Sequence, residues 1–164
     1  FSKGKISNSI FNNCGYNTKS LDIDLNGDCI DFSGSVVSLN NIKINGSGDK
    51  AISVGEGSKV NISYIDIKNA NFGLVSKDNS LLTAQYVSLN NINNGFASYK
   101  KKNEFGPGKL IVSNVEELLN VKKTFFIDKG SIIEADGNFS ANNYENMCEK
   151  YKYENKVKCI IMKK

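Results

Sequence analysis

Apolar residues in this chain recur in pairs two positions apart, and the pairs return about every 22 residues across 30–133. Leu74 stands 22 residues after Ile52, and Leu82 stands 22 residues after Val60, so the register is kept over a whole repeat. Alternate residues of a strand face the same side. Self-similarity at this period is typical of solenoids. The pattern predicts an all-β parallel β-helix with three short strands per rung.

The inward-facing pairs fall on three faces, one for each expected strand of a rung. Stacked rungs about 4.8 Å apart place like residues on like residues, which suits the Val, Ile and Leu content. The first face holds Ile30/Phe32, Ile52/Val54, Leu74/Ser76, Phe96/Ala97-Ser98 and Phe125/Ile127; the second holds Val37/Leu39, Val60/Ile62, Leu82/Ala84, Leu110/Val112 and Ile133/Ala135; the third holds Ile42/Ile44, Ile65/Ile67, Val87/Leu89 and Val115 with Leu118 or Leu119.

The periodicity divides the chain into a β-helix over 1–137 and a C-terminal cap over 138–164 of the same domain. Repeat proteins cap their ends because an open end exposes a whole rung of backbone groups. The N-terminal end has no comparable segment, so we expect an upstream domain. Two segments contain more residues than the repeat needs, about eleven more within 11–30 and about six more within 98–110. Insertions in solenoids emerge as loops, often on the binding face.

Composition excludes several function classes. The 164 residues carry a formal charge of +4, contain no His, Trp or Arg, and show no apolar run long enough to span a membrane. Nucleic-acid binding is not expected, because lysines are spread along the chain without arginines or an aromatic-flanked basic stripe. Without His, a Ser or Cys nucleophile lacks its usual base.

No metal site or cofactor is expected. A zinc site would need four thiolates from two distant cysteine pairs, 14/29 and 148/159. The late pair could form a disulfide that staples the cap, whereas for the early pair buried free thiols are at least as good an interpretation. Oxygen ligands can hold Ca²⁺, but no calcium-loop spacing occurs among the early acids, which are read as solvated turn residues: Asp22, Asp24, Asp28, Asp31 and Asp49.

One corner of the predicted rungs gathers charge. In register there, Gly55, Lys77 and Tyr99 form one column, and Glu56, Asp78 and Lys100 form the next. One interpretation is a solvated ladder of ion pairs, each worth under about 1 kcal/mol. The other is a sugar-binding groove with an aromatic platform and lysines that face an anionic polysaccharide. The candidate carbohydrate-binding residues are Glu56, Lys77, Asp78, Tyr99, Lys100, Lys101, Lys102 and Phe105.

Four segments carry a resemblance: 27–35 (GDCIDFSGS), 48–56 (GDKAISVGE), 73–78 (GLVSKD) and 99–106 (YKKKNEFG). Together they resemble the right-handed parallel β-helix repeat of bacterial secreted and surface proteins, in the pectate-lyase-like superfamily. Some of those proteins carry a spore-coat-kinase-like or lamin-tail domain upstream. The resemblance covers about 1–137. It implies carbohydrate contact as a tendency, but no position here matches the Arg, His or paired-Asp motifs of the enzymes.

Three functions follow as hypotheses. The first is a non-catalytic, extracellular or cell-surface module, a rigid scaffold that binds polysaccharide. The second is a polysaccharide lyase, hydrolase or epimerase acting on an acidic glycan, in which Lys77 or Lys100 would serve as base. The third is a structural stalk that binds nothing. The absence of Arg and His favours binding over catalysis.

Overall fold

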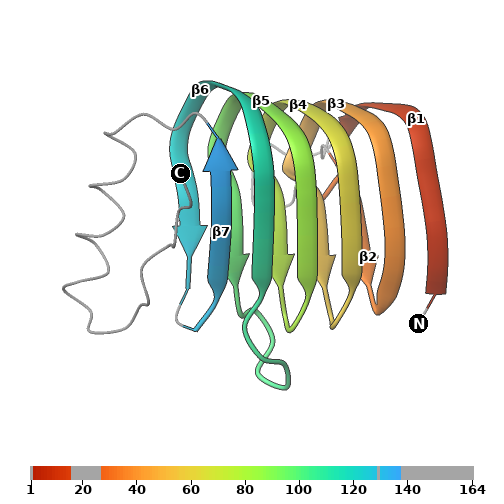
Figure 1. The fold of residues 1–164 in the computed structure, drawn as a ribbon, viewed down its shortest axis with the longest axis vertical. Helices are drawn as coiled ribbons and strands as arrows, with labels where there is room; N and C mark the ends of the chain where they lie inside the picture. The colour runs from red at the N-terminus through yellow and green to blue at the C-terminus, as the bar shows by residue number, and fades with distance from the viewer. Residues whose placement is uncertain (1, 16–26, 129, 138–164) are drawn as a thin grey trace.

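The computed structural model describes residues 2–15, 27–128 and 130–137. Within these ranges the chain forms strands and no helix, so no helix that could span a membrane is found there. All strand pairs are parallel, and the strands lie side by side in chain order except that β2 pairs only with β3 (Figure 1). The strands are β1 (Ser2–Cys14), β2 (Ile30–Ser33), β3 (Ser35–Gly55), β4 (Lys59–Lys77), β5 (Leu81–Tyr99), β6 (Lys109–Ile127) and β7 (Ile132–Gly137).

The pairing register agrees with the sequence repeat. Between β4 and β5, Val60 pairs with Leu82 and Leu74 pairs with Phe96, a constant offset of 22 positions. The pairings on either side of it, β3–β4 and β5–β6, each contain one shift of register. The result is a solenoid-like, all-parallel sheet that is not closed into a barrel and is compatible with a β-helix.

Each long strand bends at two positions where the backbone is left-handed. The first column of such residues has φ between 52° and 61°, and the second between 50° and 99°. Asn and Gly adopt this conformation at low cost, so one residue can turn the chain without breaking the ladder on either side. The structure therefore has one bent strand per repeat where the sequence pattern indicates three short ones. The columns are Asn8, Asn41, Tyr64, Tyr86 and Asn114, and Asn13, Gly46, Asn69, Asn91 and Asn120.

The apolar core lies inside these bends, and the three predicted faces all contribute to it. Leu39, Ile52 and Leu89 are at most 1% exposed, as are the rings of Phe96 and Phe125, whose centroids are 5.8 Å apart. Of the two candidates to complete the third face, Leu118 pairs with Leu89 and packs against the core, whereas Leu119 is 45% exposed. The prediction of the inward positions is confirmed.

A fourth inward column lies between the third face and the first, and the sequence analysis did not find it. Along this column each residue pairs with the next one, in the order Ser47, Ala70, Ile92 and Val121. Ser47 and Ile92 are 2% and 1% exposed. Each repeat therefore contributes one more inward residue to the core than the three predicted pairs.

A disulfide joins Cys14 at the end of β1 to Cys29 before β2, with a Cα–Cα distance of 4.9 Å. For the early pair the disulfide therefore replaces the interpretation as free thiols. Within the loop that it closes, residues 16–26 lie outside the described ranges, as do the expected cap (138–164) and the second cysteine pair within it. The second predicted excess is observed as the connection between β5 and β6, which projects beyond the other turns (Figure 1).

Candidate functional site

The charged corner predicted from the sequence forms where β3, β4 and β5 end. Gly55, Lys77 and Tyr99 occupy one column, as expected. However, the Lys77 side chain lies flat against its own sheet, and the residue is only 7% exposed. Its ammonium lies 2.7 Å from Ser53 Oγ and 3.6 Å from Asp31 Oδ1. Gly55 leaves the space that the lysine stem fills, since a Cβ there would be 2.8 Å from Lys77 Cε.

Asp78, the next residue, is fully buried and holds the loop over 100–108. Its Oδ1 accepts hydrogen bonds from the backbone N–H groups of Lys101 (2.7 Å) and Lys102 (2.8 Å). The loop also accepts a hydrogen bond, which the backbone N–H of Asn79 donates to the carbonyl of Gly106 at 2.9 Å. Lys77 and Asp78 are therefore internal parts of the corner in this structure.

Glu56 and Lys102 form an ion pair that ties the corner after β3 to the loop after β5. The hydrogen bond with Glu56 raises the pKa of Lys102 above its ordinary value. Ion pairs thus do form at this corner, as one interpretation of the sequence expected, but they do not follow the column of Glu56, Asp78 and Lys100.

The four remaining candidates present different chemistry to solvent. Lys100 and Lys101 are exposed, and neither takes part in an ion pair within the described ranges. Tyr99 and Phe105 are partly exposed. The Tyr99 ring packs edge-on against Phe126 with centroids 5.9 Å apart, and burial raises the pKa of its phenol to about 12. Two ammonium groups and two aromatic rings therefore belong to one end of the sheet.

Acidic residues also gather around a lysine, Lys50, whose charge acts on the phenol of Tyr99. Lys50 forms ion pairs with Asp28, at 3.1 Å, and with Asp49. Burial alone would lower the pKa of Lys50, but its hydrogen bond with Asp49 and the charge of Asp28 outweigh burial and raise that pKa. No group of three or more metal-ligating side chains occurs in the part of the chain that the structure describes.

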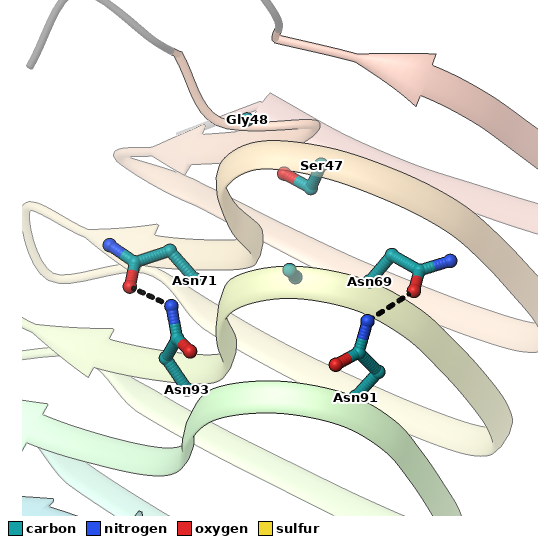
Figure 2. Close-up of a pocket in the computed structure, with 7 residues that line it drawn as sticks. Ser47, Gly48, Asn69, Asn71, Asn91 and Asn93 are labelled. Atoms are coloured by element: carbon teal, nitrogen blue, oxygen red, sulfur yellow. Dashed lines mark hydrogen bonds between the residues drawn. The ribbon is translucent and has the colours of Figure 1, made fainter. Parts of the chain in front are cut away.

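A shallow hollow of about 300 Å³ lies at the second bend, between two ladders of asparagines (Figure 2). On one side Asn91 donates to Asn69 Oδ1 at 2.6 Å, and on the other Asn93 donates to Asn71 Oδ1 at 3.2 Å. Asn-rich turns of neighbouring repeats therefore stack into hydrogen-bonded ladders, and the sequence analysis did not find the hollow between two of them.

The first bend carries an aromatic stack that the sequence analysis also missed. The Tyr64 and Tyr86 rings lie 4.5 Å apart at an angle of 7°. Tyr64 is 52% exposed. The available signal was the spacing, because 64 and 86 differ by the repeat length and both tyrosines stand where other repeats have asparagine.

No family model, no curated protein and no solved structure matches this chain.

Proposed function

We propose that this protein is a non-catalytic surface module that binds acidic polysaccharide. In this proposal the stack is a right-handed parallel β-helix of the pectate-lyase-like kind, with about 22 residues per rung and one twice-bent strand in each rung, and it lies outside the cell or on its surface. The observation that carries the binding function is the pair of exposed lysines, Lys100 and Lys101, on a loop that Asp78 holds in place.

The other two candidate lysines do not add to the charge that this pair offers to a ligand. Lys102 is engaged with Glu56, and Lys77 with Ser53 and Asp31, so their ammonium groups are already partnered. A fixed backbone reduces the entropy lost when a ligand orders the loop. Lysine acts on a carboxylate or sulfate as a compact point charge. Two adjacent lysines therefore suit a polymer with repeated anionic groups.

Aromatic residues next to these lysines give the site a sugar-compatible surface. Tyr99 is held by its edge-on contact with Phe126, and Phe105 belongs to the same loop. Aromatic rings contribute a flat apolar face, and tyrosine adds a polar hydroxyl. Uronate rings have both an apolar face and a negative charge, so they match the combination better than a simple inorganic anion does.

The test is affinity electrophoresis of the whole chain through gels that contain acidic or neutral polysaccharides. We expect retardation by acidic polymers, and we expect Lys100→Ala/Lys101→Ala to lose most of it with an unchanged melting temperature. Higher salt should weaken the retardation. The control is Lys3→Ala/Lys5→Ala, which removes two exposed lysines of β1.

Two outcomes would contradict the proposal. Equal retardation of the two double variants would mean that net charge, and not this loop, binds the polymer. Shortening of the polymer chains after incubation with the protein would indicate catalysis.

A further inference from the structure

The geometry points to a second binding site, for neutral sugars, at the Tyr64–Tyr86 stack on the first bend. This site is separate from the Lys100/Lys101 loop and does not depend on the function proposed for that loop. It is a hollow of about 100 Å³ lined by the two rings together with polar and charged side chains, among them Asn41, Lys43, Asp66, Ser88 and Glu116.

Tyrosine is an unfavourable residue at these two positions. Both backbones are left-handed, with φ of 61° at Tyr64 and 55° at Tyr86, a conformation that asparagine tolerates and bulky side chains do not. The neighbouring repeats have asparagine there, at Asn41 and Asn114. Backbone strain of this kind persists where a site needs the side chain. A purely structural corner would be served better by asparagine.

The stack leaves an aromatic surface open to solvent. Tyr64 has Tyr86 on one side and Asn41 on the other, and the Asn41 amide is turned toward Asn8, to which it donates a 2.8 Å hydrogen bond. Because an asparagine side chain is shorter than a tyrosine side chain, Asn41 leaves the outer part of the Tyr64 ring uncovered. The exposure of 52% agrees with this arrangement. The ring can therefore receive the apolar C–H face of a pyranose.

An irregularity of the sheet adds a carboxylate to the same hollow. Val87 pairs with Val115, but Ser88 pairs with Glu117, so Glu116 is an extra residue in β6. Bulges of this kind re-aim a side chain and are frequent beside functional sites. Glu116 lines the hollow next to Ser88 and the tyrosines. A carboxylate accepts hydrogen bonds from two hydroxyl groups, as a vicinal diol offers them.

The charges around the stack favour a neutral ligand. Lys43, Asp66 and Glu116 line the hollow, and Asp66 is paired with Lys68 at 3.6 Å, so two ammonium groups balance the two carboxylates. An acidic polymer would meet two carboxylates here. A proline-rich peptide could cover the rings, but it has few donors for Asp66 and Glu116. A neutral sugar satisfies both the aromatic surface and the acceptors.

The test is retardation of the whole chain in gels that contain a soluble β-glucan, mannan, xylan or α-glucan, followed by titration with the oligosaccharides of the polymer that retards it. The variant is Tyr64→Asn/Tyr86→Asn, which restores the asparagine column. We expect affinity about tenfold weaker or worse, because a well-placed aromatic contact accounts for that much. We also expect an equal or higher melting temperature, since the strained residues are gone.

Three further variants show whether the sugar binds at the stack or elsewhere on the surface. Leu119→Asn removes an apolar side chain away from the stack, 45% exposed, and should leave retardation unchanged. Glu116→Ala keeps both tyrosines and should weaken retardation by itself, which keeps the test valid if the double tyrosine variant does not fold. Lys100→Ala/Lys101→Ala should not affect neutral polymers, and the tyrosine variant should not affect acidic ones.

Three results would overturn the inference. One is no retardation of the wild-type chain by any of the neutral polymers. Another is retardation that survives in both Tyr64→Asn/Tyr86→Asn and Glu116→Ala. The third is binding to a polyproline peptide through the stack with no binding to the glycans.

Discussion

The buried carboxylate of Asp78 accepts a 2.7 Å hydrogen bond from the backbone N–H of Lys101, 23 positions further along the chain. A second bond from Lys102 reaches the same oxygen atom. The turn after β4 therefore fixes the loop after β5, and a side chain that the sequence analysis included among the candidate sugar contacts is buried and binds that loop.

Asp78→Ala is expected to release this loop. Hydrogen bonds to a charged acceptor contribute about 1.5–3 kcal/mol, so the free energy of unfolding should fall by about that amount. A lysine-specific protease should then cut within 100–102 faster than in the wild type. Asp78→Asn is the matched control, because it keeps an acceptor oxygen and suits a φ of 54°. Equal cleavage rates for Asp78→Ala and the wild type would show that the loop is held by other contacts.

The Cys14–Cys29 disulfide should contribute substantially to stability. It closes a loop with a sequence separation of 15, for which the loss of chain entropy in the unfolded state corresponds to about 3 kcal/mol. Cys14→Ser/Cys29→Ser should lower the free energy of unfolding in urea by about that amount. The control is the same comparison in the presence of a reductant, where the two chains should unfold alike. A wild type whose unfolding curve without reductant matches that of Cys14→Ser/Cys29→Ser would contradict the prediction.

Gly73→Ala is expected to destabilise the fold, because the added Cβ would lie 2.5 Å from the backbone oxygen of Gly95 on the next strand. Relief requires movement of two paired strands. Overpacking of this kind costs about 1–3 kcal/mol. Gly4→Ala makes the same chemical change where no atom lies within 4 Å, and should be nearly neutral. Thermal unfolding of the two variants gives the comparison directly.

Ionisation of Tyr99 should weaken the fold at high pH. Burial raises the pKa of its phenol from 10.0 to about 12. Between these values the unfolded chain loses this proton and the folded chain keeps it, so the contribution is complete below pH 10 and is lost as the pH approaches 12. Stability of the wild type should therefore fall more steeply over this interval than that of Tyr99→Phe. Phenolate absorbance should show a late-titrating tyrosine that Tyr99→Phe lacks, and parallel stability curves would refute the assignment.

The inward positions of the sheet were predictable because each repeat contains apolar residues at alternate positions, and a strand turns alternate residues to one side. The column of Ser47, Ala70, Ile92 and Val121 escaped for the same reason. It has a single inward residue per repeat, flanked by glycine or polar residues, and a single small or apolar residue does not make an alternating pattern.

The candidate corner was predicted as a set of neighbours, and the register places its columns as expected. Its burial was not predictable. Lys77 and Asp78 are charged residues at a turn, where solvent exposure is the normal expectation. Their burial results from the length of the next connection, which folds back over Asp78, and from the missing side chain of Gly55.

The connection between β5 and β6 runs from Tyr99 to Lys109, whereas β4 and β5 are joined within Lys77 to Leu81. Leu82 still pairs with Leu110, and Phe96 still pairs with Phe125, so the extra residues leave the ladder on both sides intact. We therefore expect this connection to accept an inserted sequence, because exposed loops are the places where insertion is tolerated. A peptide epitope grafted there would be displayed at a fixed height along the stack, while the apolar interior stays untouched.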